Sequence, residues 1–358
     1  MDGNTEALTG DGWKRHYELK AGDRILVICP DSKDITWQSV RKVYRDQGVT
    51  EVVHWKNSHG FNVVSSPRQQ WLAAHRDRNG YTHFEAAARL RTTADLSSSN
   101  RQLITGGGFS QAFAMKPSHE DPLVELVGWV ITEGHYQKQR AQTGVLVAQS
   151  PKANPEKTKQ IRKIKIHFAR QGATATENPN SANGMINFYF GAGIGNVIRE
   201  VAPDKQITPA FLRALTLQQA ERLYQTILDG DGHRTKLRSH DGYNRTVSTE
   251  NFIQKDPGRI DSYQMLAAML GKRTCAKPHK AKQGIFNTVT YHRPLTTARH
   301  LKDDRISHSG VLWSPHTEMG TWLARREGGT FWIGELGTSR ETEGHPAASF
   351  PEQTSRTP

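Results

Sequence analysis

Two apolar segments in the middle of the chain share one pattern. Residues 126–134 read Leu-Val-Gly-Trp-Val-Ile-Thr-Glu-Gly, and residues 224–232 read Tyr-Gln-Thr-Ile-Leu-Asp-Gly-Asp-Gly. Together with the residues before it, each segment is long enough for a helix, and each ends in a carboxylate followed by glycine. The pattern therefore predicts two helices that are built alike and end alike.

Small residues recur one helical turn apart in both predicted helices. The first helix carries Gly128 and Thr132, and the second carries Thr226 and Gly230. Residues four apart lie on the same face of an α-helix, and small side chains on that face let two helix backbones approach closely. If the helices pack along these faces, the carboxylates at their ends meet.

These carboxylates are Glu133 and Asp231. Two carboxylates in contact repel each other, and the C-terminal end of a helix is already negative. A divalent cation removes this repulsion, and hard oxygen ligands suit magnesium, which keeps several waters and takes few protein carboxylates. Such a metal can activate water and stabilise an in-line displacement at phosphorus. We therefore predict that Glu133 and Asp231 are both metal ligands and catalytic residues.

The two segments resemble the paired motifs of the LAGLIDADG homing endonucleases, also called the DOD type. In the family pattern, Glu133 and Asp231 stand at the metal-binding acidic positions of the first and second repeats. Asp229 keeps a second, commonly acidic position where the first repeat has Ile131, and Gln225 is larger than the usual small residue. The resemblance implies two αββαββα halves in one monomeric chain, with Mg2+ as cofactor and double-stranded DNA as partner.

The family often uses a basic residue near each acid to help the attacking water or the leaving group. Lys280 and Lys282, which precede a late predicted strand, could serve as catalytic residues of the second half, although exposed loop lysines are the alternative. The first half offers no preferred candidate. His135 and His233 each follow the acid–glycine end of a motif. They either contact scissile phosphates or metal-bound water, or are simply exposed at helix ends.

Strands and a basic helix are predicted around the two motifs. Residues 143–149, 184–190 and 286–291 read as strands, and a helix that contains Lys157 begins at Pro155. A run of basic residues on such a helix is usually a solvated face. Polar side chains on strands are what a sheet in the major groove of DNA needs, whereas Lys and Arg on phosphates supply non-specific affinity.

The composition favours a polyanionic partner. The 358 residues carry a net charge of +13, and the pI is about 9.7, as in proteins that bind nucleic acid. Mean hydropathy is −0.68, no apolar run is long enough to span a membrane, and the polar N-terminus lacks a signal-peptide core. Cys29 and Cys275 are too few for a disulfide framework or a cysteine-based zinc site. We expect a cytoplasmic protein of a bacterial or phage-infected host cell, without membrane contact.

The flanking regions read as β-rich and resemble a Hint domain, the domain that splices inteins. A helix is predicted at 84–91. The catalytic groups of splicing are replaced: Ala7 stands at the nucleophile position, Gln69 at that of the assisting His and Glu335 at that of the cyclising Asn. Residues 7–11 and 18–23 match the opening pattern of that domain, and residues 310–317, 320–325 and 330–334 match its closing strands. Further strands are predicted at 24–29, 51–55 and 61–64.

The predicted organisation is discontinuous. Residues 1–105 and 304–335 are the N- and C-terminal Hint-like parts, 119–300 is the endonuclease domain, and 338–358 is a disordered tail rich in Ser, Thr, Glu and Pro. The predicted fold class is α+β, a two-repeat LAGLIDADG endonuclease inserted into an all-β Hint-like domain.

The predicted function is site-specific, metal-dependent double-strand cleavage of DNA by a protein whose Hint domain is splicing-inactive. The alternative is a DNA-binding protein derived from a homing endonuclease without cleavage activity. The three replaced splicing groups argue strongly against an active splicing element.

Overall fold

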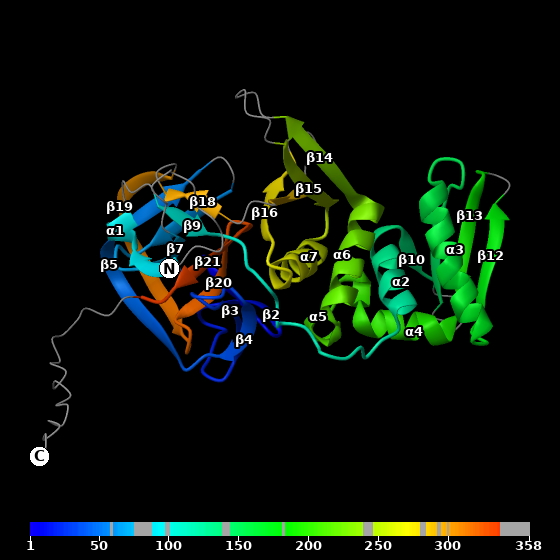
Figure 1. The fold of residues 1–358 in the computed structure, drawn as a ribbon, viewed down its shortest axis with the longest axis horizontal. Coiled ribbons are helices and arrows are strands. Elements are labelled where there is room, and N and C mark those ends of the chain that lie inside the picture. The colour runs from blue at the N-terminus through cyan, green and yellow to red at the C-terminus, as the bar shows by residue number, and fades with distance from the viewer. Residues whose placement is uncertain are drawn as a thin grey trace, which may run out of the picture.

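The computed structural model describes residues 1–57, 60–74, 88–96, 101–137, 144–180, 183–238, 246–279, 284–291, 295–298 and 301–336. A β-rich region lies at one end of an elongated molecule, and the helices lie with further strands towards the other end (Figure 1). The predicted disordered tail at 338–358 falls outside the described residues. Within the described part of the chain, no helix is both long and apolar enough to cross a membrane.

The β-rich region is built from both ends of the chain. Strand β1 pairs with β20, β5 pairs with β19 along its whole length, and β9 pairs with β18. The first and last parts of the sequence therefore fold together. The elements are β1 (Glu6–Thr9), β2 (Gly12–Arg15), β3 (Arg24–Ile28), β4 (Ile35–Ser39), β5 (Lys42–Lys56), β6 (Asn62–Ser65), β7 (Gln70–Ala74), β8 (Ala88–Thr92), α1 (Thr93–Leu96), β9 (Gln102–Ile104), β18 (Leu295–Thr297), β19 (Lys302–His316), β20 (Thr321–Arg326) and β21 (Gly329–Gly334).

The helix predicted at 84–91 is wrong in its described part. Residues Ala88–Thr92 form strand β8, which pairs with β7 so that Leu90 lies opposite Leu72. Apolar and basic residues alternate along this segment, Ala88 and Leu90 with Arg89 and Arg91. A period of two is the pattern of a strand, and it decides the local structure here.

The central part of the chain has the α+β class that the sequence predicts. Its first half runs α2, β10, β11, α3, β12, β13, α4, which is the predicted αββαββα order, and its second half runs α6, β14, β15, α7, β16, β17, with no last helix among the described residues. The elements are α2 (Asp121–Thr132), β10 (Gly134–Tyr136), β11 (Val145–Gln149), α3 (Pro155–Arg170), β12 (Ala175–Asn180), β13 (Met185–Phe190), α4 (Ala192–Val201), η1 (Pro203–Lys205), α5 (Pro209–Ala214), α6 (Leu217–Asp231), β14 (Gly232–Arg238), β15 (Thr246–Gln254), α7 (Pro257–Met269), β16 (Arg273–Pro278) and β17 (Phe286–Tyr291).

The two halves differ in how their sheets end. The first sheet has the order β10-β11-β13-β12 and stands alone. The second, β14-β15-β17-β16, continues through β21 into β20, β1, β3 and β4 of the β-rich region. The junction is the pair Cys275 and Gly329. A continuous sheet thus joins the predicted segments 119–300 and 304–335, whose division into separate domains remains a prediction.

Helices α2 and α6 lie side by side (Figure 1) and pack along the small-residue faces that the sequence predicts. A Cβ atom added at Gly128 would lie 2.7 Å from Cγ2 of Thr226, and one added at Gly230 would meet Cβ of Thr132 at 2.5 Å. The side chain of Thr226 therefore packs against Gly128, and that of Thr132 packs against Gly230. The Thr132 hydroxyl donates to the Gly128 carbonyl at 2.9 Å, so its polar atom stays satisfied within its own helix.

The close approach predicts a strong penalty for any side chain at residue 128. We expect Gly128→Ala to lower the free energy of unfolding by about 1–3 kcal/mol through overpacking, measured by urea denaturation. Thr226→Gly removes the atoms that the new methyl group meets, so the double variant should lose less than the sum of the two single losses. Gly193→Ala in α4 is the control, because an added Cβ there meets nothing within 4 Å. Purely additive losses would show that the two positions do not touch.

Candidate acid pair and flanking sheets

The helix packing brings the two predicted acids to one place. Glu133 is the C-cap residue of α2, and its N–H donates to the Trp129 carbonyl at 2.9 Å. Asp231 is the last residue of α6. The Lys157 ammonium from α3 joins the two helix ends, with Nζ 2.9 Å from Glu133 Oε1 and 3.1 Å from the Gly230 carbonyl oxygen. The acids therefore share one electrostatic environment at the C-terminal ends of both helices.

The proximity of the two acids affects the ionisation of Asp231. Burial raises the pKa of the Asp231 carboxyl group, and the negative charge of Glu133 raises it further. A hydrogen bond from Gln254 Nε2 to Asp231 Oδ2 at 2.6 Å, together with the charges of Arg259 and Lys157, opposes the rise. The ionised form of Asp231 is therefore disfavoured in the protein alone.

Lys205 is a further basic group that senses both acids. Burial lowers the pKa of the Lys205 amine, the nearby charge of Arg259 adds to this, and the charges of Asp231 and Glu133 act in the opposite direction. Its backbone lies in the left-handed region, with φ of 65°. The acid pair is thus surrounded by Lys157, Lys205 and Arg259.

The sequence did not single these residues out. Lys157 was one member of a basic run, and no spacing linked Lys205, Gln254 or Arg259 to the motifs. The lysines that the sequence did propose, Lys280 and Lys282, lie outside the described residues, so their role stays a prediction.

The two histidines after the motifs occupy equivalent places. His135 is in β10 opposite Leu146, and His233 is in β14 opposite Asn251. Both are exposed and begin the outer strand next to an acid. The two readings of these residues, phosphate contact or simple exposure, both agree with this position.

The oxygen donors at the helix ends fit a hard cation. They are the carboxylates of Glu133 and Asp231 and the Gly230 carbonyl, which Lys157 already uses as an acceptor. No group of three or more His, Cys, Asp or Glu side chains in the described part of the chain is arranged to enclose a metal ion. Magnesium binds through one or two carboxylates and completes its shell with water and substrate phosphate. The raised pKa of Asp231 shows negative charge that such an ion would relieve.

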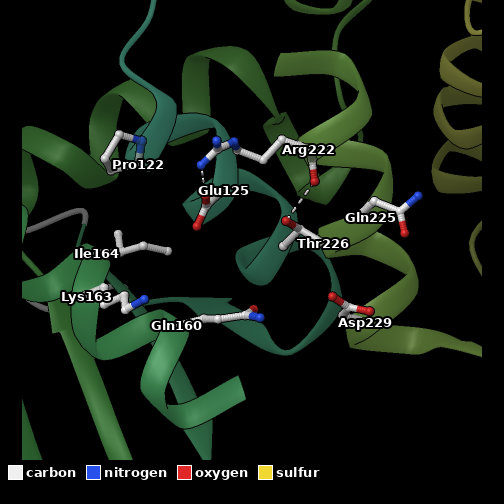
Figure 2. Close-up of a pocket in the computed structure, with 9 residues that line it drawn as sticks. All are labelled: Pro122, Glu125, Gln160, Lys163, Ile164, Arg222, Gln225, Thr226 and Asp229. Atoms are coloured by element: carbon white, nitrogen blue, oxygen red, sulfur yellow. Dashed lines mark hydrogen bonds and ion pairs between the residues drawn. The ribbon is translucent and has the colours of Figure 1, made fainter. Parts of the chain in front are cut away.

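The second acidic position of the repeat has a different role. Asp229 forms an ion pair with Arg234 at 2.8 Å and lines a pocket of about 430 Å³ on the flank of α2 (Figure 2). In the same pocket Arg222 is paired with Glu125. The residues that line it are Pro122, Glu125, Gln160, Lys163, Ile164, Arg222, Gln225, Thr226 and Asp229, so neither Glu133 nor Asp231 is among them.

One face of the first sheet carries no Asp, Glu, Lys or Arg among the described strand residues. Helix α3 covers the opposite face. There Arg162 Nη2 donates to Glu177 Oε1 at 2.5 Å, and this bond lowers the pKa of the Glu177 carboxyl group. The row Ala148, Asn187 and Asn178 crosses three strands on the uncovered face. The other described side chains on this face are His135, Leu146, Thr176, Asn180, Met185 and Tyr189. Asn side chains are suited to reading adenine edges in the major groove.

The face of the second sheet that carries Asn251 and Asn287 is covered at its β16 edge by the β-rich region. Asn287 Nδ2 donates to Asn251 Oδ1 at 3.3 Å on the open part of this face. At the far edge, Gly60 of the β-rich region lies against Cys275, where an added Cβ would be 2.8 Å from the Cys275 Cβ atom. Burial accordingly raises the pKa of the Cys275 thiol.

The residues compared with splicing groups only partly come together. Gln69 Nε2 donates to the Gly334 carbonyl at 2.6 Å, and the Gln70 N–H donates to the Glu335 carbonyl at 3.0 Å. Ala7 is fully buried in β1, paired with Lys14 and Ala324. The group that contacts the Gln69 side chain is instead the buried Met1 amine, at 3.4 Å from Oε1.

Several solved structures of homing endonucleases are similar to about half of the chain. A structure of mesophilic variants of I-DmoI is 8% identical with a TM-score of 0.36, and the match covers 48% of this chain and 89% of that one. I-WcaI bound to its DNA recognition sequence is 11% identical with a TM-score of 0.30, covering 49% and 77%. A mutant of I-SmaMI is 11% identical with a TM-score of 0.28, covering 47% and 79%. The sequence matches no protein-family model and no curated protein.

The raised pKa of Asp231 predicts that its neutral isostere stabilises the metal-free protein. Because the folded-state pKa lies above the unfolded one, ionisation of Asp231 weakens folding as pH rises through that pKa. We expect Asp231→Asn to melt at a higher temperature than wild type at pH 7 in EDTA. The gain should disappear below the ordinary carboxyl pKa, because Asp231 is then uncharged in both states. Asp229→Asn, which loses an ion pair with Arg234, should show no gain, and an equal gain in both variants would contradict the assignment.

Proposed function

We propose that this protein is a site-specific DNA endonuclease that breaks both strands in a metal-dependent reaction. The observation that carries the proposal is the meeting of Glu133 and Asp231 at the ends of two packed helices, with a sheet on either side. In this proposal residues 119–300 form the endonuclease segment and the surrounding β-rich region is a Hint-like domain that does not splice. Both repeats lie in one chain, so a monomer suffices.

Each acid would serve one DNA strand. Glu133 and Asp231 would hold Mg2+, which when bound activates water and stabilises charge at the scissile phosphate. Gln254 orients Asp231 by its hydrogen bond. Lys157 and Lys205 supply positive charge beside the acids, where they can pair with phosphate oxygens. Lys280 and Lys282 remain candidates for the second half.

The sheets would supply DNA binding. Uncharged polar side chains such as Asn178 and Asn187 lie on the open face of the first sheet, and Asn251 and Asn287 lie on that of the second. Such groups read base edges, while the excess of basic residues neutralises phosphates. The net charge of +13 is consistent with phosphate neutralisation by the basic residues.

A second function is favoured by one observation. Lys157 already bonds to Glu133 Oε1, and Lys205 and Arg259 lie within the same electrostatic environment. An acid pair that is neutralised by the protein's own cations could be structural. The chain would then be a DNA-binding protein derived from a homing endonuclease and would not cleave.

Cleavage assays on a selected DNA target separate these functions. We expect Glu133→Gln and Asp231→Asn each to abolish double-strand cleavage in Mg2+, since losing the metal-based stabilisation costs several kcal/mol in the transition state. Specific DNA binding should stay near wild type, because the binding groups lie on the sheets. Asp229→Asn should still cleave, since Asp229 faces a different pocket. Wild-type rates in both acid variants would assign Glu133 and Asp231 to helix-end structure and favour the non-cleaving protein.

The Hint-like region should leave the polypeptide intact. Ala7 and Gln69 offer no nucleophile and no acid–base group, and Glu335 cannot cyclise as Asn does. We expect intact-mass measurement after prolonged incubation with a thiol to give only the full-length mass. A fragment cut before Ala7 or after Glu335 would contradict the inactive assignment.

A further inference from the structure

The Lys157 ammonium occupies a specific place between the two motif helices. It bonds to the Glu133 carboxylate at the end of α2 and to the Gly230 carbonyl near the end of α6. The side chains of Lys157 and Glu133 are 24% and 28% exposed, so the bonds are partly shielded from water. This one cation connects both halves of the molecule.

The backbone that carries Lys157 is firmly anchored. Ile161, Ile164 and Phe168 bury one face of α3, and Arg162 fixes the helix to β12 through Glu177. The α3 backbone is therefore held in place by contacts that do not involve the Lys157 side chain. Lys157 can leave the acid pair by rotating its side chain without unfolding the helix.

The two oxygens that Lys157 uses are those that a hard cation requires. One is a carboxylate oxygen, and the other is a carbonyl at a helix C-terminus, where partial negative charge accumulates. A divalent cation bound to these oxygens would lie within about 2–2.6 Å of each, in the space that the ammonium fills. The ammonium and the metal ion cannot use both oxygens at the same time.

We propose that Lys157 is a built-in competitor of the metal ion. In the metal-free protein its ammonium holds the helix ends together, and a divalent cation binds as Lys157 withdraws. This inference rests on the proposed metal-dependent function. A withdrawn ammonium is free to pair with a DNA phosphate, so DNA that captures Lys157 strengthens metal binding, and the coupling is reciprocal.

Calcium titration of the full-length protein without DNA tests this directly. Isothermal calorimetry at one fixed pH would compare wild type with Lys157→Met, Lys157→Arg and Lys159→Met. We expect Lys157→Met to bind Ca2+ about tenfold or more tightly, since the competitor is gone. Lys157→Arg should stay close to wild type because it keeps the charge. Lys159→Met is the matched control, because Lys159 lies on the same helix and its ammonium pairs with the exposed Glu156 carboxylate at 3.9 Å, away from the acid pair.

A melting experiment gives a second, independent readout. Without metal, Lys157→Met should melt below wild type, because the two carboxylates lose a cation that both sense. Added Ca2+ should raise the melting temperature of the variant and so remove the difference. Lys157→Gln keeps a hydrogen-bond donor for Glu133 without the charge, and it should also bind Ca2+ more tightly. This variant keeps the test decisive if the methionine variant folds poorly.

The outcomes separate the inference from the function on which it rests. Glu133→Gln, alone and combined with Lys157→Met, reports whether binding occurs at the acid pair. If Ca2+ binding is lost in Glu133→Gln but equal in wild type and both uncharged Lys157 variants, the competitor role is overturned while the metal site survives. If no variant shows Ca2+ binding that depends on Glu133, both the competitor role and the metal-dependent function are overturned.

Discussion

The contact of α2 with α6 through Gly128 and Gly230 determines the chemistry around it. Two helix C-termini that meet bring their free carbonyls together, and here each end also carries a carboxylate. Negative charge concentrated in this way has to be offset by nearby cations or by protonation. The Lys157 ammonium bridges the helix ends, and burial together with the charge of Glu133 raises the pKa of Asp231. The close helix contact at the two glycines thus brings negative charge together, and a bound cation would neutralise that charge.

The two halves have similar backbone folds, but their acids have partners of different charge. Glu133 receives a charged partner from the first half, whereas Asp231 receives an uncharged amide from Gln254. The two acids therefore have different hydrogen-bond partners, even though each ends an equivalent helix and precedes an equivalent strand. Divergence of two repeats within one chain permits this, because each site can change its neighbours without changing the other.

The sequence predicted what depends on local pattern. Helical periodicity and the Gly–Thr spacing were enough to place the two helices, their packing faces and the meeting of their ends. Lys157 was missed because its contact with Glu133 depends on how α3 crosses α2, which no spacing encodes. The helix predicted at 84–91 is wrong over 88–91, where apolar and basic residues alternate and form strand β8. The contact of the Met1 amine with Gln69 was not predicted, because it joins positions 68 residues apart that no spacing links.

The β-rich region has a structural task that does not require splicing chemistry. Strand β16 would otherwise end the second sheet with unpaired backbone groups, a state that invites aggregation. The Ala276 N–H instead donates to the Gly328 carbonyl at 3.0 Å, and the Thr274 N–H donates to the Thr330 hydroxyl at 2.9 Å. Gly328 has φ of 78° and sits so close to the Ala276 carbonyl that a side chain there would collide with it. Since these contacts close the sheet that supports α6, loss of the β-rich region would disturb the helix that positions Asp231. The β-rich region is therefore part of the structural support of the segment whose second sheet it continues.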